Sequence, residues 1–109
     1  MAEYDGTFTK QPTEKLKIRH NFSSNMEAGE AIVAGTLTAT KLSDLSDATN
    51  DIIVSGSLSW TQVSLVYGVQ AGTDGEMYKI ALAVTTTKLL GTQTNVRLEA
   101  EHLMTVEER

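Results

Sequence analysis

AGTDGEMYKIALAVTTT, residues 71–87, is the stretch that decides the fold class of this chain. Its second half alternates large apolar side chains with small or polar ones, which predicts a half-buried β-strand over residues 76–87. The large set is Tyr78, Ile80, Leu82 and Val84. Its first half contains Asp74-Gly75, a pair favoured in tight hairpins because glycine adopts positive φ at no steric cost. We therefore predict a hairpin with its turn at Gly72, Asp74 and Gly75, and a Tyr78 hydroxyl that reaches a backbone group.

Period-two alternation recurs on both sides of this stretch. Residues 61–70 place Val63, Leu65, Tyr67 and Val69 on one face, and residues 92–106 place Val96, Leu98 and Ala100 inside. Further strands are expected at 16–22, at 30–41 with a bulge at Gly35, and at 51–60 with a kink at Gly56. Leu89 and Leu90 are expected in a loop, and a short helical turn at 26–31 or 42–48 stays open. Six to seven short strands separated by turn signals predict an all-β antiparallel sandwich.

Length and composition are typical of one soluble domain. A chain of 109 residues has the size of a single domain, and its 15 threonines favour strands. Zero cysteines exclude disulfides, and no stretch approaches the ~18 apolar residues of a membrane helix. The N-terminus lacks the basic-then-apolar pattern of a signal peptide. We expect an extended N-terminal arm at residues 1–13 and a sandwich domain at 14–109.

The charge pattern argues against nucleic acid as the main partner. The formal net charge is −5, with nine basic residues among fourteen acidic ones, whereas phosphate binding needs clustered lysine and arginine. The densest basic run is Lys10, Lys15, Lys17 and Arg19. Such runs are mostly a solvated strand face, and we interpret this one in that way.

Candidate catalytic and metal-binding residues are few. His20 and His102 have no nearby carboxylate or cysteine at triad or ligand spacing, and we expect both at solvent-facing strand positions. Asp44, Asp47 and Asp51 share one polar loop, but their spacing is not that of an EF-hand, and aspartates also cap turns for local reasons. Trp60 is expected to be buried, as is common in sandwiches. The sequence therefore indicates no enzyme, metal or cofactor.

Several motifs together resemble a group of small tailed-phage and prophage virion proteins of the fibre–tail adaptor type. These are the K-Q-P segment at Lys10 to Pro12, the G-x-D-G-x-x-Y-x-I turn at Gly72 to Ile80, and the paired threonines at Thr85 to Thr87. Their order and spacing carry the resemblance, which spans nearly the whole chain and is weakest at 103–109. The chain departs from the group by inserting Lys88-Leu89-Leu90 before Gly91, which puts the shape of that loop in doubt.

The resemblance implies an immunoglobulin-like sandwich that attaches one virion part to another, in several copies and without a cofactor or small-molecule substrate. Its location would be the tail or neck of a virion assembled in the host cytoplasm. Partner contacts are expected at Tyr4, Phe8, Pro12, Met104 and Arg109. A head–tail connector, collar or capsid decoration protein stays open among virion roles.

Two other classes of function make different demands on the structure. A carbohydrate-binding module predicts an exposed Trp60 or Tyr67 on a flat polar face. A hydrolase would require His20 or His102 to meet a carboxylate and a nucleophile in one cleft.

Overall fold

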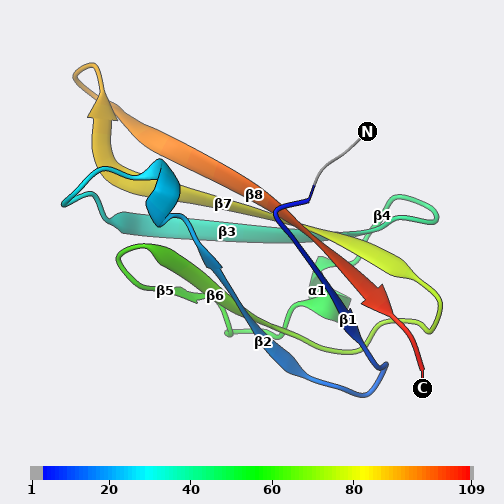
Figure 1. Cartoon of the computed structure of the whole chain (residues 1–109). Helices are drawn as coiled ribbons and strands as arrows, with labels where there is room; N and C mark the ends of the chain where they lie inside the picture. Colours follow the sequence, from blue (N-terminus) through cyan, green and yellow to red (C-terminus); the bar gives the residue numbers. More distant parts are fainter. Residues whose placement is uncertain (1–3, 109) are drawn as a thin grey trace.

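The computed structural model describes residues 4–108, which form two packed β-sheets (Figure 1). The five-stranded sheet has the order β1–β8–β7–β3–β4, and the three-stranded sheet has the order β2–β6–β5. The strands are β1 (Gly6–Lys10), β2 (Leu16–Asn21), β3 (Ile32–Lys41), β4 (Ser46–Asp47), β5 (Ser59–Trp60), β6 (Ser64–Val69), β7 (Met77–Leu90) and β8 (Thr94–Val106). Two short helices, η1 (Ser23–Asn25) and α1 (Thr49–Ile52), lie in connections, and within residues 4–108 no helix is long and apolar enough to cross a membrane. The predicted all-β sandwich is confirmed.

The long hairpin β7–β8 lies inside the five-stranded sheet, between β1 and β3. Its register pairs Tyr78 with Met104, Leu82 with Ala100 and Val84 with Leu98, so the inward side chains of the two strands lie opposite one another. The predicted inward set of β7 is buried throughout. Burying an aliphatic side chain of this size stabilises a fold by roughly 1.5–3 kcal/mol. This hairpin therefore supplies much of the core.

The tip of this hairpin differs from expectation. β7 continues to Leu90, so Leu89 and Leu90 are strand residues and not loop residues. They are 47% and 59% exposed, at the end of the hairpin (Figure 1). The register shifts between Thr85 and Leu89, and this irregularity separates the tip from the part of β7 that faces the core.

The three-stranded sheet is built around β6. The side chains of Leu65, Tyr67 and Val69 are fully buried and pack against the core residues of β7 and β8, as their alternation predicts. β2 pairs antiparallel with β6, from Leu16 opposite Val69 to Asn21 opposite Ser64. β5 covers only the start of β6 on the other side.

The connection from β6 to β7 is a crossover between the sheets, so the predicted hairpin is wrong. β6 pairs with β2 and β5, whereas β7 pairs with β3 and β8. Ala71 and Gly72 have φ values of 51° and 96°, in the left-handed region, where the chain leaves β6 for the other layer. The tight turn itself is present, because the N–H of Glu76 donates to the carbonyl of Thr73 at 3.0 Å. Sequence alternation identifies the two strands but not the sheets to which they belong.

Two smaller expectations are also wrong. The bulge in β3 lies between Ile32 and Ala34, before Gly35. Residues 51–60 form the end of α1, an isolated bridge from Ile53 to Val69, and the two residues of β5, because the chain turns at Gly56 with φ 76°. The open question of a helical turn at 26–31 or 42–48 is answered too, because the short helices of the described residues, η1 and α1, lie outside both segments.

The described part of the N-terminal segment joins the five-stranded sheet. β1 is extended, as expected, and pairs in parallel with β8, from Gly6 opposite His102 to Lys10 opposite Val106. Phe8 packs against the core and Lys10 is fully buried. This stretch is therefore an edge strand of the sandwich.

Candidate functional site

One corner of the sandwich brings together residues that are distant in sequence. Lys10 ends β1, and its Nζ donates to the carbonyl oxygens of Gln11 at 2.6 Å, of Pro12 at 3.2 Å and of Ala71. Burial lowers the pKa of Lys10, and the carboxylate of Glu14 opposes that shift. The ammonium therefore ties the turn after β1 to the start of the crossover. The expectation of a solvated Lys10 is wrong, whereas Lys15, Lys17 and Arg19 are exposed as expected.

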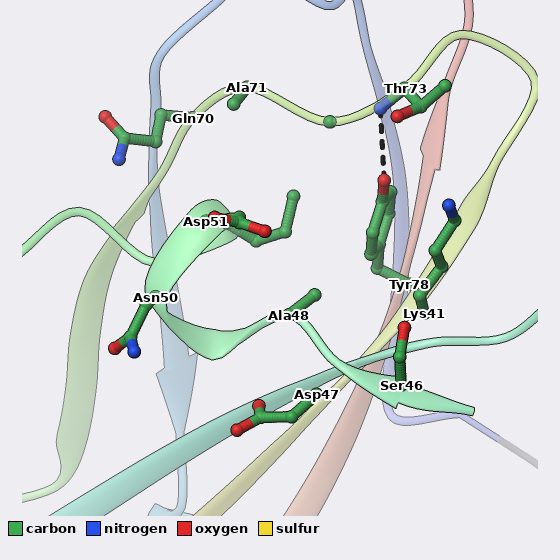
Figure 2. Close-up of a pocket in the computed structure, with 12 residues that line it drawn as sticks. Lys41, Ser46, Asp47, Ala48, Asn50, Asp51, Gln70, Ala71, Thr73 and Tyr78 are labelled. Atoms are coloured by element: carbon green, nitrogen blue, oxygen red, sulfur yellow. Dashed lines mark hydrogen bonds between the residues drawn. The ribbon is translucent and has the colours of Figure 1, made fainter. Parts of the chain in front are cut away.

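The crossover is fitted closely into this corner. A Cβ on Gly72 would lie 2.7 Å from Cγ2 of Val106, so only glycine fits without displacing the Val106 side chain. Tyr78 is buried, and its hydroxyl accepts a hydrogen bond from the N–H of Thr73 at 3.0 Å. The predicted contact of the Tyr78 hydroxyl with a backbone group is confirmed (Figure 2).

An open pocket of ≈ 550 Å³ lies beside the corner, between α1 and the crossover (Figure 2). Its polar lining includes Lys41, Asn50, Asp51, Gln70 and Thr73. The buried face of Tyr78 forms part of its wall, so the pocket offers amides and charges but no exposed aromatic ring among these lining residues. It is suited to polar contacts.

Asp44 and Asp47, near this pocket, cap turns. Asp44 Oδ1 accepts the N–H of Ser46 at 3.0 Å and its hydroxyl at 2.6 Å, and Asp47 Oδ1 accepts the same two groups of Thr49. These bonds hold the pKa of both carboxyls below the usual range. Within residues 4–108 no three His, Cys, Asp or Glu side chains are grouped to hold a metal ion.

The two histidines meet across the open side of the sandwich. Nδ1 of His20, on β2, lies 3.0 Å from Nε2 of His102, on β8. Nδ1 of His102 lies 2.6 Å from the hydroxyl of Tyr67, on β6. The chain of contacts Tyr67–His102–His20 therefore joins the two sheets and ends at the half-exposed His20.

One arrangement of protons gives both of these contacts a donor and an acceptor. The Tyr67 O–H donates to Nδ1 of His102, and the Nε2–H of His102 donates to Nδ1 of His20. Reversing the chain would leave the buried Tyr67 O–H without an acceptor. Protonating both rings would oppose two N–H groups at 3.0 Å. The contact therefore excludes simultaneous protonation of the two rings.

Burial controls the titration of the three groups. It lowers the pKa of His102 to about 4, with a further lowering from His20 and an opposing effect of Asp5. It lowers the pKa of His20 too, again opposed by Asp5. It raises the pKa of Tyr67, which stays protonated.

The expectation that both histidines face solvent is wrong, and the sequence contained the signal. His20 shares its parity with Leu16, Ile18 and Phe22, which were expected on one face. His102 continues the inward series Val96, Leu98 and Ala100, and is 4% exposed. In both strands the histidine has the same parity as the apolar residues, so the alternation of a β-strand directs it to the inner face.

A cleft of ≈ 370 Å³ opens beside the histidine pair. It lies between the edge strand of each sheet and is lined by Asp5 to Phe8 from the first, Lys17 to His20 from the second, and His102. The carboxylate of Asp5 accepts the N–H of Glu101 at 2.8 Å. The group hydrogen-bonded to His102 is a protonated phenol, so the described contacts do not form an activated nucleophile.

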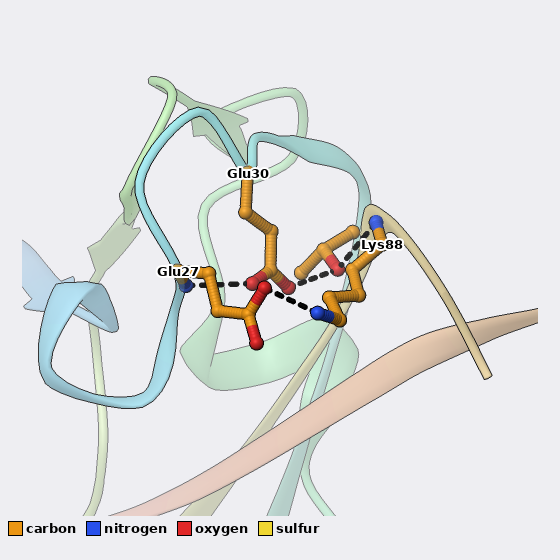
Figure 3. A network of polar contacts seen from close by, with 4 residues as sticks. Glu27, Glu30 and Lys88 are labelled. Carbon is orange, nitrogen blue, oxygen red and sulfur yellow. Dashed lines mark hydrogen bonds and ion pairs between the residues drawn. The ribbon is translucent and has the colours of Figure 1, made fainter.

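Another buried polar group, missed by sequence reasoning, lies near the hairpin tip. Glu30 is 6% exposed, and its carboxylate accepts the hydroxyl of Thr86 and the N–H of Glu27. These two bonds lower the pKa of Glu30. Lys88, near the end of β7, pairs with Glu27 beside it (Figure 3). The network anchors the loop before β3 to β7.

The remaining predicted residues have mixed environments. Tyr4, Phe8 and Pro12 are half-buried, whereas Met104 is fully enclosed in the core and offers no surface to a partner. Arg109 lies outside the described residues. Trp60 is 42% exposed, so the expectation of a buried Trp60 is wrong, because it lies on β5, a two-residue strand at the edge of its sheet.

A comparison with models of protein families finds no match for this chain, and searches for similar curated proteins and for similar solved structures find none either.

Proposed function

We propose that this chain is a non-enzymatic structural protein of a tailed-phage virion, an adaptor that links tail fibres or another appendage to the tail through protein–protein contacts. One observation carries the proposal. Lys10 of the K-Q-P segment donates to the carbonyl of Ala71, next to Gly72 of the turn motif, and Tyr78 of that motif bonds the same turn. Two motifs that would be unrelated in a chance likeness are thus parts of one corner, which supports a shared architecture.

The surroundings of the titratable groups favour binding over catalysis. The buried lysine, the histidine pair and Glu30 each have hydrogen-bond partners that explain their burial. The immunoglobulin-like character of the sandwich is part of the same proposal, and the packing of a five-stranded on a three-stranded sheet is compatible with it. Head–tail connector, collar and capsid decoration roles would use the same contacts with different neighbours.

A pull-down with the untagged protein tests the proposal. Separated tail, fibre and capsid proteins are each presented, and stable capture of one virion component is expected. The control is an unrelated folded protein of the same size and net charge, which lacks this surface but keeps the charge. Capture of no virion component, together with binding to a glycan array, would contradict the proposal.

The second candidate is a carbohydrate-binding module, and the exposure of Trp60 favours it. An exposed indole stacks on sugar rings, whereas Tyr67, the other candidate platform, is buried. Replacing Trp60 with Ala would abolish glycan binding if this candidate were correct. The control is Val33→Ala, which removes another exposed apolar side chain. Absence of glycan binding by the unmodified protein would remove this candidate, and binding that both variants retain would exclude Trp60 as the sugar platform.

A further inference from the structure

The outer edge of β2 has unpaired backbone groups. Within residues 4–108, β2 pairs with β6 on one side and has no strand on the other. The N–H of Phe22 donates to Val63, which continues the register in which Ile18 faces Tyr67 and His20 faces Leu65. Because antiparallel bonding alternates between residues, Ile18 and His20 bond to β6, whereas Lys17 and Arg19 direct N–H and C=O outward.

The same alternation sorts the side chains along this edge. Lys17 and Arg19 are exposed on the outer face, whereas Ile18 and His20 point into the cleft beside β1. In a strand added to this edge, the side chains on the outer face would therefore lie beside the cationic Lys17 and Arg19. Its other side chains would enter a cleft walled by Phe8 and Ile18.

Charge decides which occupant fits. Pairing of β2 with a second copy, antiparallel about Ile18, would oppose Lys17 to Arg19 and repel. The chain carries a net charge of −5, yet this edge is basic, and Asp5, the acidic residue lining the cleft, is engaged by the N–H of Glu101. The complementary strand has acidic residues outward and apolar residues inward.

We propose that the free edge of β2 and the adjoining cleft bind an extended segment of another polypeptide, in which acidic and aliphatic residues alternate. Main-chain bonds to Lys17 and Arg19 supply affinity, and the alternate side chains supply specificity. This inference rests on the proposed adaptor function and names the contact that such an adaptor would use. Lysine and arginine on an edge also prevent aggregation, and the experiment separates the two roles.

The probe is the acetylated and amidated peptide Glu-Val-Glu-Val-Glu-Val, titrated into the whole protein and followed by amide hydrogen exchange with NMR. In the free protein the amides of Lys17 and Arg19 should exchange fast and those of Ile18 and His20 slowly. Saturating peptide should slow exchange at Lys17 and Arg19 at least tenfold and leave Ile18 and His20 unchanged. Protection at alternate residues is the signature of strand addition, which a purely electrostatic contact would not produce.

Two variants sharpen the test. Arg19→Gln removes the charge and keeps the outward N–H, so it should weaken binding two- to fivefold. Arg19→Pro also removes that N–H, and should abolish binding while β6 pairing is kept, since proline is tolerated at outward positions of edge strands. Arg97→Gln, on the outer face of β8, is the charge control and should bind like the unmodified protein. The slow exchange of Ile18 reports that each variant is folded.

Unchanged exchange at Lys17 and Arg19 with saturating peptide would overturn the inference and leave these residues as protection against aggregation. Equal slowing of exchange at Lys17 and Arg19 by a single-stranded oligonucleotide would overturn it too, because it would show a response to negative charge alone. If the peptide does not bind but the pull-down captures a tail protein, the β2 edge is not the contact site and the adaptor function stands. If the peptide binds but no virion protein is captured, the β2 edge is a binding site and the adaptor function is contradicted.

Discussion

The ammonium group of Lys10 donates a hydrogen bond to the carbonyl oxygen of Ala71, which lies 61 positions later in the chain. The bond connects the edge strand β1 of one sheet to the crossover that leaves the other. It lies at the corner where Gly72 touches Val106 and Tyr78 bonds Thr73. This corner fixes how the two sheets are joined, and the first two predictions concern it.

Replacing Lys10 with Met should lower the free energy of unfolding by about 1.5–3 kcal/mol, the usual contribution of a hydrogen bond to a charged group. Methionine keeps the apolar stem but leaves three carbonyls without their donor. Urea unfolding followed by tryptophan fluorescence measures the change. The control Lys17→Met, at an exposed position, should change stability by no more than ~0.5 kcal/mol. Equal stability of the two variants would show that the Lys10 bonds contribute nothing.

Replacing Gly72 with Ala should cost more than the same change at Gly75. Both glycines have φ near +90°, so both variants bear backbone strain of about 1–2 kcal/mol. Only at Gly72 would the new Cβ meet another atom, at 2.7 Å from Val106, which adds about 1–3 kcal/mol of overpacking. Thermal unfolding of the pair measures the difference. A larger loss at Gly75 would contradict the packing described for the corner.

Stability should fall with pH below 6.5 because of the histidine pair. The folded pKa of His102 is about 4, below its unfolded value of 6.5, so the unfolded state binds more protons between these values. The stability is therefore fully present above pH 6.5, is lost as pH falls toward 4, and changes no further below it. The loss should be about 2 kcal/mol once solvent screening is allowed for, and His20 adds to it in the same direction.

His102→Gln tests this pH dependence, since glutamine bonds both neighbours but does not titrate. The variant should show a flatter stability profile between pH 6.5 and 4, measured by urea midpoints in a series of buffers. A profile as steep as that of the unmodified protein would assign the pH dependence to other groups.

Replacing Thr86 with Val should destabilise the fold at pH 7 by removing the hydroxyl that bonds Glu30. The folded pKa of Glu30 is lowered, so this stability is present above the unfolded pKa and is lost as pH falls through the folded pKa. The effect should therefore shrink in acid. Thr85→Val, on the opposite face of β7, is the matched control. A loss of stability that is the same at pH 7 and pH 3 would show that the carboxylate is not involved.

Alternation predicted the strands well, because each inward stripe is set by local side-chain order. The stripe Tyr78, Ile80, Leu82 and Val84 is buried as expected. Sheet membership could not be predicted, because the β6–β7 crossover and a hairpin share the same turn residues. The burial of Lys10 could not be predicted either, since it depends on the carbonyl of Ala71 from a distant segment. The histidines could have been placed, since both continue an apolar stripe.

The proposed adaptor function, the attachment of one virion part to another, is tested most directly by cross-linking mass spectrometry of phage particles assembled in cells that make this protein. We expect the protein to copurify with particles and to form cross-links from Lys15 or Lys17, beside the free edge of β2, to a tail or fibre subunit. Particles that assemble completely without containing the protein would contradict the adaptor function.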